Sequence, residues 1–426
     1  MPTWIFAQTE SLCNFLVPLL LNFSPAQQRH ALNFIEALMV SGSKHKTLRH
    51  LTGLLRLPHA DEFALADFFR ASPWDHQALQ KGVTLCLLKL VVQLQTRSGW
   101  RLLFLKIDDA LCPKDVATQA LAAVSLQYDH VTQRRQRGKC TNSSRYVTLS
   151  LQIGPAQFCL AWRLYLPAKV VKRLNRGRAV AEKLTYHKLV ALVEQMLDEV
   201  APQLPPACRV YVLFDAWYDN QQLLNYIRAH GWHFICATRS NRNLSGRPLC
   251  HWWPHLGYQR ITRVVVRSAK RSRTYQTRYH IGQLRRYPQP VVAIISKRKQ
   301  RDTHPAYFLC SDTSLHVRTI LKYYGYRWQA EVDNWFLKER FGLSDFRVQS
   351  LEAILRWHTL VFAAYAFVQT QRVAPLLTDP KVTLQPLGDV LRTHQAAHVR
   401  HTVCHIAALV RSGLSDAELV AMLLPP

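Results

Sequence analysis

The sequence predicts a mixed α/β fold in which a helical N-terminal domain precedes a core of strands and helices. Apolar residues recur at helical spacing before Trp100, and apolar strands that end in polar residues follow it. A helical pattern returns after about residue 313 and continues to the end of the chain. Because 48% of the 426 residues are hydrophobic, we expect a globular protein with two or three domains.

The chain is strongly basic, with 55 Lys and Arg against 27 Asp and Glu and a formal charge of +28. A charge of this size repels itself, and it is most often matched by a polyanion such as DNA or RNA. A membrane surface is the rival partner. The apolar stretches at 12–23 and 360–368 are too short for a membrane span, so we expect a soluble cytoplasmic protein. The ten cysteines form no CxxC pair, which argues against zinc and against a disulfide framework.

Residues 1–98 are predicted to form the helical N-terminal domain. The stretches "AQQRHALNFIEALMV" at 26–40 and "QALQKGVTLCLLKLVVQLQ" at 77–95 have helical apolar spacing. Between them, "SGSKHKTLRHLTGLLRL" at 41–57 indicates a small basic helix after a turn. This domain either contacts nucleic acid or is a purely structural helical bundle, and both interpretations remain open.

Residues 99–240 are predicted to form the first part of the core. An apolar strand runs into Asp108 and Asp109, and a hairpin of two strands turns at Gly154-Pro155. A helix, a strand that ends at Asp215, a second helix and another strand then follow. The periodicity indicates a mixed α/β domain, and the order of elements is also that of an RNase H-like core, a narrower assignment that depends on the candidate site residues. The stretches that predict it are "WRLLFLKIDDALCP", "RYVTLSLQIG", "QFCLAWRLYLP", residues 185–200, "CRVYVLFDAWYDN" and "NQQLLNYIRAHGWHFICATR".

The core is predicted to be interrupted by a basic insertion and completed after it. Residues 241–312 are rich in β-branched, aromatic and basic side chains, as in "RVVVRSAKRSRTYQTRYHIGQL", and favour strands. Residues 313–372 complete the core with two helices, and residues 373–426 form a helical tail. The basic runs "RRQRGK" at 134–139 and "KRLNRGR" at 172–178 either contact nucleic acid or are solvated loops.

The stretch "YYGYRWQAEVDNWFLKERFGL" at 323–343 is predicted to be one helix with a charged face. Counted from Tyr324, the residues Arg327, Glu331 and Lys338 fall within a sector of roughly 60° on a helix. Asp333 lies nearly opposite, so it points away from whatever Glu331 contacts. Arg327 and Glu331 could also be an ordinary surface pair. The aromatic residues expected to pack the rest of the helix are Trp328, Trp335, Phe336 and Phe341.

Three carboxylates at the ends of elements are the candidate catalytic residues. They are Asp108 or Asp109, Asp215 and Glu331. Loops after buried strands are where α/β domains hold ligands, although a single Asp there is more often a turn residue. Clustered carboxylates favour Mg²⁺ or Mn²⁺, and two such ions can drive an in-line attack on a phosphodiester.

With its four residues and their spacing, the charged face resembles a known signature. Tyr324, Arg327, Glu331 and Lys338 reproduce the Tyr-Arg-Glu-Lys pattern of bacterial DDE insertion-sequence transposases, the superfamily of insertion sequence four. "IDDALCPK" and "VLFDAWYDN" look like its two aspartate blocks, and "HKTLRHL" and "ASPWD" look like its N-terminal region. The likeness spans roughly residues 45–370.

The resemblance implies roles for individual residues. Asp108, Asp215 and Glu331 would hold two divalent metal ions in an RNase H-like domain with a β-rich insertion. Relatives commonly have Asp-Asp-Thr where this chain has Asp108-Asp109-Ala110, so either aspartate remains open as the first ligand; we favour Asp108 because it follows the strand first. The residues that would contact the transposon end are Tyr324, Arg327, Lys338 and, in the insertion, Trp252 and Trp253.

The resemblance also implies a function and partners. We expect a transposase that cleaves double-stranded DNA at terminal inverted repeats, joins the 3′-hydroxyl ends to target DNA and acts as a homodimer in a synaptic complex. It would work in the cytoplasm, associated with the nucleoid. The alternatives are a related metal-dependent nuclease that cuts without joining, and a basic DNA-binding protein, a degenerate transposase that no longer cuts.

Overall fold

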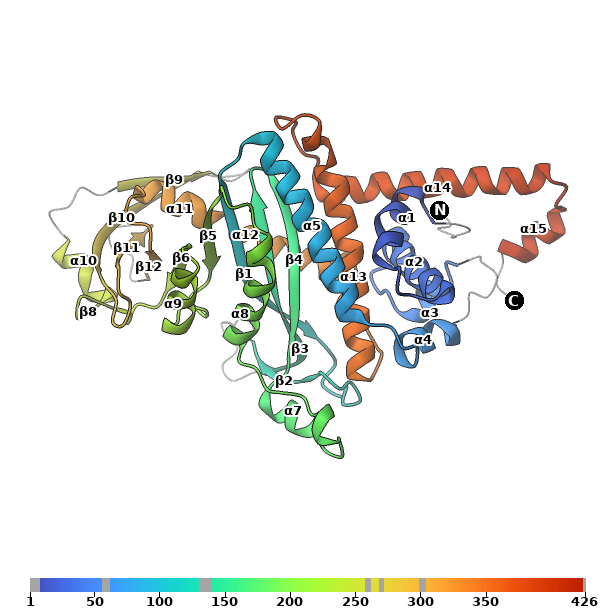
Figure 1. The fold of residues 1–426 in the computed structure, drawn as a ribbon, viewed down its shortest axis with the longest axis horizontal. Coiled ribbons are helices and arrows are strands. Elements are labelled where there is room, and N and C mark those ends of the chain that lie inside the picture. Colours follow the sequence, from blue (N-terminus) through green and yellow to red (C-terminus); the bar gives the residue numbers. More distant parts are fainter. Residues whose placement is uncertain are drawn as a thin grey trace.

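The computed structural model describes residues 8–55, 62–129, 140–256, 262–267, 272–298 and 304–423. A ten-stranded mixed sheet forms its centre, and a small two-stranded sheet lies against one end of it (Figure 1). The large sheet contains β1 (Leu102–Pro113), β2 (Ser125–Tyr128), β3 (Cys140–Ile153), β4 (Ala156–Tyr165), β5 (Arg209–Phe214), β6 (His233–Thr238), β9 (Thr262–Arg267), β10 (Ser272–Gln283), β11 (Pro290–Lys297) and β12 (Ala306–Cys310). The small one contains β7 (Asn243–Leu244) and β8 (Arg247–Pro248).

The strand order places the parallel strands in the middle of the sheet. Neighbours run β2-β3-β1-β5-β6-β12-β11-β10-β9, and β4 pairs with β3. The pairs β1–β5 and β5–β6 are parallel, while the other pairs of this sheet are antiparallel. The predicted hairpin is present as β3 and β4. The strands of the basic insertion continue the same sheet, because β12 pairs with β6.

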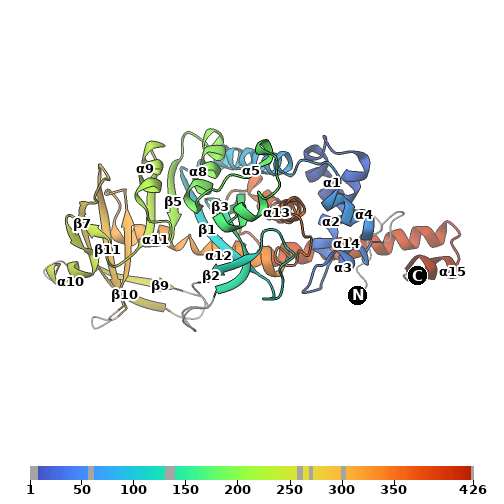
Figure 2. The ribbon, with the colours of Figure 1, turned by 90° about the horizontal axis from the view of Figure 1, so that it is seen from below.

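Helices cover both faces of the sheet. On one side lie α8 (Leu189–Val200) and α9 (Gln221–Ala229), and on the other lies α12 (Trp328–Glu339), as Figure 2 shows. Side chains alternate along β1. Leu103, Leu105 and Ile107 belong to the larger core, while Phe104 packs in a second core with Val317 and Ile320 of α11 (Val317–Gly325). The face of β1 that carries Phe104 also carries Lys106 and Asp108.

The N-terminal helices pack beside the sheet rather than over its middle (Figure 1). They are α1 (Glu10–Leu16), α2 (Pro25–Val40), α3 (Leu48–Thr52), α4 (Glu62–Arg70) and α5 (His76–Ser98). Their starts have local causes. Ser24 and Gln27 form a capping box at the start of α2, and Asp75 accepts hydrogen bonds from the first turn of α5. The described residues before Trp100 are thus mostly helical.

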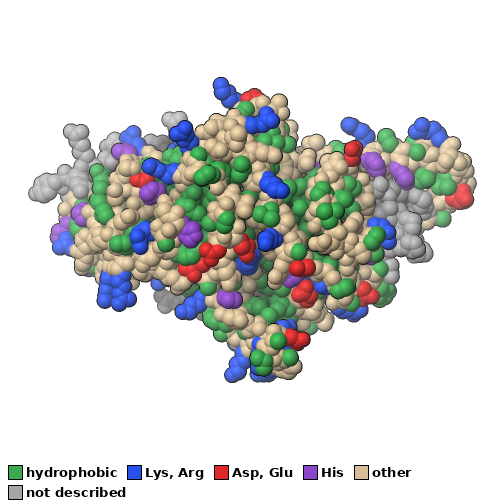
Figure 3. Space-filling model, in the orientation of Figure 1, with side chains coloured by type: hydrophobic (Ala, Val, Ile, Leu, Met, Phe, Trp, Pro, Cys, Tyr) green, Lys and Arg blue, Asp and Glu red, His purple; other side chains and the backbone are tan. Residues whose placement is uncertain are grey.

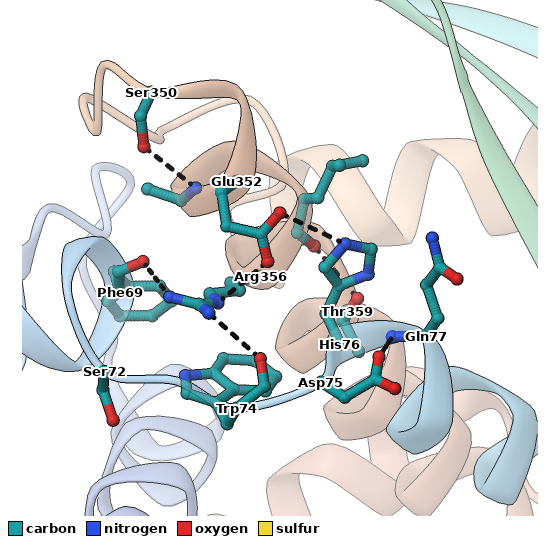
Figure 4. A network of polar contacts seen from close by, with 12 residues as sticks. Phe69, Ser72, Trp74, Asp75, His76, Gln77, Ser350, Glu352, Arg356 and Thr359 are labelled. Carbon is teal, nitrogen blue, oxygen red and sulfur yellow. Dashed lines mark hydrogen bonds and ion pairs between the residues drawn. The ribbon is translucent and has the colours of Figure 1, made fainter. Parts of the chain in front are cut away.

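A buried arginine attaches the turn between α4 and α5 to the long helix α13 (Leu351–Val373), as Figure 4 shows. Arg356 donates hydrogen bonds to the carbonyl oxygens of Phe69 and Trp74, each at 3.0 Å. Its Nε lies 3.2 Å from Oε1 of Glu352, and Nε2 of His76 lies 3.7 Å from the other oxygen of the same carboxylate. Arg356 and Glu352 of α13 thus contact α4, the turn after it and the start of α5, which fixes how these N-terminal helices meet α13.

The apolar helix α13 runs through the centre of the protein. Together with the turn after it, residues Leu351–Leu377 are long and apolar enough to cross a membrane, which corrects the expectation that this segment is too short. However, 89% of its apolar window is buried inside the protein. Burial of this kind is what the core helix of a soluble protein shows.

The C-terminal part of the chain is helical and extends away from the sheet (Figure 1). It consists of α14 (Leu387–Arg411) and α15 (Asp416–Leu423). His398 and His394 of α14 lie 2.9 and 3.2 Å from a carboxylate oxygen of Glu36 on α2. Burial alone would raise the pKa of Glu36, but the two histidines outweigh it and lower that pKa to about 2. This cluster attaches the tail to the N-terminal helices.

A buried histidine should make the fold sensitive to acid. His358 of α13 is fully buried among Trp162, Phe346 and Tyr146, and burial, with Lys114 nearby, lowers its pKa to about 3. Below pH 6.5 the unfolded chain binds a proton here that the folded chain does not. The free energy of unfolding should therefore fall by about 1.4 kcal/mol per pH unit from this group as the pH drops below 6.5.

Replacing this residue tests that expectation. His358→Phe should show a shallower loss of unfolding free energy between pH 6.5 and about 5 in urea titrations than the wild type. His401→Phe, at an exposed position of α14, is the matched control and should keep the wild-type slope. Equal slopes for His358→Phe and the wild type would contradict the assignment.

Candidate active site

The charged segment at 323–343 forms two helices instead of the single helix expected from the sequence. α11 ends at Gly325 and α12 begins at Trp328, with Tyr326 and Arg327 in the turn between them. Tyr324 is therefore on α11, while Glu331 and Lys338 are on α12. The predicted face of four aligned side chains is wrong as a single-helix feature, but Arg327 and Glu331 remain in contact across the junction.

The sheet brings the first and second aspartates to the side where α12 lies. β1 and β5 are parallel, with Lys106 opposite Leu213 as the last matched pair. Asp108 and Asp215 each follow two residues later, so both point to the face of Lys106 and Leu213. The charges of Asp215 and Glu331 both act on Asp108, which places the three carboxylates in one neighbourhood.

β1 does not end before the aspartates, which corrects the sequence interpretation. The strand continues to Pro113 through its pairing with β3, although its pairing with β5 stops at Lys106. Asp108 thus lies just beyond the point where β1 stops pairing with β5. Asp215 does follow the end of its strand directly, as predicted.

Asp108 is the most buried of the three carboxylates. Asn334 of α12 donates a hydrogen bond to its Oδ2 at 2.9 Å, and Arg327 Nη1 lies 3.4 Å from its Oδ1. Burial raises its pKa to about 7; Arg327 opposes this shift, while Asp109, Asp215 and Glu331 add to it. Asp108 therefore lies among like charges, a situation that a bound cation would relieve.

Asp109 points to the opposite face of β1 and has different partners. It forms an ion pair with the buried Arg145 at 3.4 Å, and the Tyr218 hydroxyl donates a hydrogen bond to it at 3.0 Å. Arg145 lies on β3 and Tyr218 follows Asp215 in the loop after β5. Asp109 thus connects β1 to the loop after β5 on the face of the sheet opposite α12, whereas Asp108 lies on the face of Glu331.

The three predicted DNA-contacting residues near Glu331 are only partly brought together. Arg327 bridges Asp108 and Glu331; burial works against its charge, but Tyr324, Asp108 and Glu331 outweigh it and raise its pKa. Tyr324 packs on Phe308, and burial raises its pKa to about 12. Lys338 is half-buried and acts electrostatically on Cys112 near the far end of β1, away from the Arg327 bridge.

The tryptophans also differ from their expected surroundings. Trp328 and Trp335 of α12 are 64% and 47% exposed, so the prediction that they pack the helix is wrong for both. Phe336 is partly buried and Phe341 fully buried, as expected. In the insertion, Trp252 stacks on His280 at 4.1 Å, and Arg278 and Lys297 lie 4.3 and 4.6 Å from the ring of Trp253.

Several residues of the site were not identified from the sequence. Asn334 lies three positions after Glu331, hence on the same side of the helix, so its spacing was a usable signal. No sequence signal pointed to Arg145 or Tyr218, because their contacts with Asp109 join segments far apart in the chain. Of the basic runs, residues 172–178 lie on and after α7 (Ala168–Leu174), and residues 134–139 are outside the described residues.

The donors at this site suit a divalent cation in their chemistry. Carboxylate oxygens are the ligands that Mg²⁺ and Mn²⁺ prefer, and Asp109, Asp215 and Glu331 add to the rise in the pKa of Asp108 that burial causes. Among the described residues, however, no group of three or more His, Cys, Asp or Glu is arranged closely enough to hold a metal ion. Arg327 occupies the position between Asp108 and Glu331 instead.

The opposite face of the protein carries acidic groups. Figure 3 shows the face on which α8 and α9 lie, with carboxylates gathered near its middle. α8 itself contributes Glu194, Asp198 and Glu199. These carboxylates lie on a face over which Lys and Arg side chains are also spread.

Comparison with known families identifies the chain. The profile described as DDE superfamily endonuclease matches residues 18–277, more than half of the chain, and that described as transposase DDE domain matches residues 189–367. The first match contains Asp108 and Asp215, and the second contains Asp215 and Glu331. No curated protein matches the chain. The mixed α/β architecture with its large central sheet agrees with a DDE, RNase H-like core, and the chain belongs to the DDE superfamily of endonucleases and transposases.

Proposed function

We propose that this protein is a DNA transposase of the insertion-sequence-four type, which nicks DNA at terminal inverted repeats and joins the freed 3′-hydroxyls to target DNA. The observation that carries the proposal is that Arg327 contacts both Asp108 and Glu331, and that Asp215 and Glu331 act electrostatically on Asp108, within the matched DDE regions. The Tyr-Arg-Glu-Lys spacing in this sequence supports the narrower assignment to that superfamily.

In this proposal Asp108, Asp215 and Glu331 hold two Mg²⁺ or Mn²⁺ ions. When bound, such ions activate a water or a 3′-hydroxyl and stabilise the leaving oxygen of the phosphodiester. Arg327 is the internal cation that neutralises Asp108 and Glu331 in the free protein. It can turn to a DNA phosphate when the carboxylates have other partners, which gives one side chain a role in both states.

The side of the sheet that bears α12 is the proposed DNA surface. Arg327 and Lys338 would contact phosphates. Tyr324 would support Arg327, because the Arg327 guanidinium lies 5.9 Å from the centre of the Tyr324 ring. Trp252 and Trp253 remain proposed contacts of the DNA end, with Arg278 and Lys297 beside Trp253 as further cations. The N-terminal helices would bind the end, and two copies would act together in the cytoplasm on nucleoid DNA.

Product analysis tests this function against its two alternatives. The protein is incubated with a labelled duplex taken from the DNA that flanks its own gene, with a supercoiled plasmid and with Mg²⁺ or EDTA. A transposase gives Mg²⁺-dependent nicks and label joined to the plasmid. Nicks without joined label would indicate a metal-dependent nuclease, and salt-dependent binding without nicks would indicate a non-catalytic DNA-binding protein.

A further inference from the structure

The helix that carries Glu331 contains a second carboxylate, Asp333, which is 2% exposed and faces the interior. On a helix, Asp333 lies about 200° around from Glu331, whereas Asn334 lies only about 60° away. The two consecutive residues therefore point in different directions. Asn334 reaches Asp108, and Asp333 enters the core between the sheet and α13.

Asp333 accepts hydrogen bonds from three separate elements. Ser150 of β3 donates to its Oδ2 at 3.0 Å, and Gln157 of β4 donates to the same oxygen at 2.6 Å. The hydroxyl of Tyr365 on α13 donates to its Oδ1 at 2.6 Å. Both carboxylate oxygens are thus used, and every partner lies on an element other than α12.

A buried cation balances this carboxylate. Lys106 of β1 is fully buried, donates a hydrogen bond to Gln152 at 3.2 Å and interacts electrostatically with Asp333. Lys106 lies two residues before Asp108 on the same face of β1, and it is opposite Ser150 in the β1–β3 pairing. A buried charge pair contributes little to stability compared with an apolar pair of similar size. A role in geometry fits the directional hydrogen bonds that surround Asp333.

We propose that Asp333 is a positioning residue that sets the rotation of α12 and so places Glu331 and Asn334 against Asp108. Three directional hydrogen bonds and one charge define a single orientation of the helix, which the apolar contacts of Ala330 and Leu337 do not define alone. A rotation of one residue, about 100°, would carry Glu331 away from Asp108. This inference rests on the proposed role of Asp108 and Glu331 as metal ligands.

The first test replaces the carboxylate while keeping its shape. Asp333→Asn removes the negative charge near Lys106 and replaces one acceptor oxygen by an amide N–H₂, so the hydrogen bonds that orient α12 should weaken. Mn²⁺ binding, followed without DNA from the electron paramagnetic resonance of the free ion, should weaken by about tenfold or more. The Mg²⁺ concentration for half-maximal nicking should rise by the same factor, with DNA binding in EDTA unchanged. The control Glu339→Gln, an exposed carboxylate of α12, should behave as the wild type.

Two further variants separate positioning from plain stability. Tyr365→Phe keeps the charge and removes one hydrogen bond, and it should weaken Mn²⁺ binding by about threefold. The double variant Lys106→Met with Asp333→Leu removes both buried charges, so it should regain part of the unfolding free energy that Asp333→Leu alone loses. The regain should be incomplete, because the donors that bonded Asp333 lose their acceptor. We expect the Mn²⁺ binding of the double variant to stay weak, because the directional hydrogen bonds remain absent.

The outcomes distinguish this inference from the proposed function. If the wild type binds Mn²⁺ and nicks DNA, and Asp333→Asn binds Mn²⁺ equally well, the positioning role is refuted while the function stands. Recovery of Mn²⁺ binding together with stability in the double variant would show that Asp333 is only structural. A wild-type protein that binds no Mn²⁺ and does not nick would refute the proposed function and this inference together.

Discussion

Glu331→Gln should lower the rate of Mg²⁺-dependent nicking by about a thousandfold or more while leaving DNA binding intact. The change keeps the size of the side chain and removes a charge that the proposed ions require, and loss of several kcal/mol of transition-state stabilisation corresponds to that factor. Rates are measured on the labelled end duplex, and DNA binding in EDTA is measured by fluorescence anisotropy.

The control for this variant comes from the same helix. Glu339→Gln removes an exposed carboxylate eight residues further on, so it reports any general effect of lost negative charge on α12. We expect it to nick at the wild-type rate. If Glu331→Gln also nicked at that rate, Glu331 would be an ordinary surface partner of Arg327, the simpler interpretation of their contact.

The two neighbouring aspartates should respond very differently to the same substitution. Asp108→Asn should lose nicking by about a thousandfold and bind Mn²⁺ poorly, because Asp108 faces Glu331 and carries the raised pKa of the cluster. Asp109→Asn should retain Mn²⁺ binding within about tenfold, because its carboxylate serves Arg145 and Tyr218. Electron paramagnetic resonance and nicking rates of the two variants, measured side by side, check this order.

The opposite order of effects would change the assignment of the first metal ligand. If Asp109→Asn lost Mn²⁺ binding and Asp108→Asn kept it, the first ligand would be the aspartate on the other face of β1. The local structure would then have to rearrange, because Asp109 points away from α12 in the folded protein described here. Equal loss in both variants would instead mean that the doublet acts as one unit.

The sequence predicted the parts of the fold that depend on local pattern. Helical spacing before residue 98, the hairpin of β3 and β4, and the strand that ends at Asp215 all follow from periodicity and turn residues. The alternation of side chains along β1 also contained an unused signal. Residues 108 and 109 of one strand must face opposite sides, and this separates Asp108 from Asp109 without any coordinates.

The features that the sequence could not predict depend on contacts between distant segments. β1 continues past Asp108 because β3 pairs with it, and the break between α11 and α12 follows no proline and leaves Arg327 between Asp108 and Glu331. Ser150 and Asp333 are 183 positions apart, so no local pattern connects them. Trp328 and Trp335 are a different case, because their residue type predicted burial and both are exposed in the folded protein.

The central claim is that the carboxylates of β1, β5 and α12 form one metal-dependent nuclease centre. The most direct measurement is nicking of the labelled end duplex in Mg²⁺ by the wild type and by Asp215→Asn, with binding of both proteins confirmed in EDTA. We predict nicking by the wild type and none by the variant, at equal binding. Nicking that persists in Asp215→Asn, or binding by both proteins with no nicking by either, would contradict this claim.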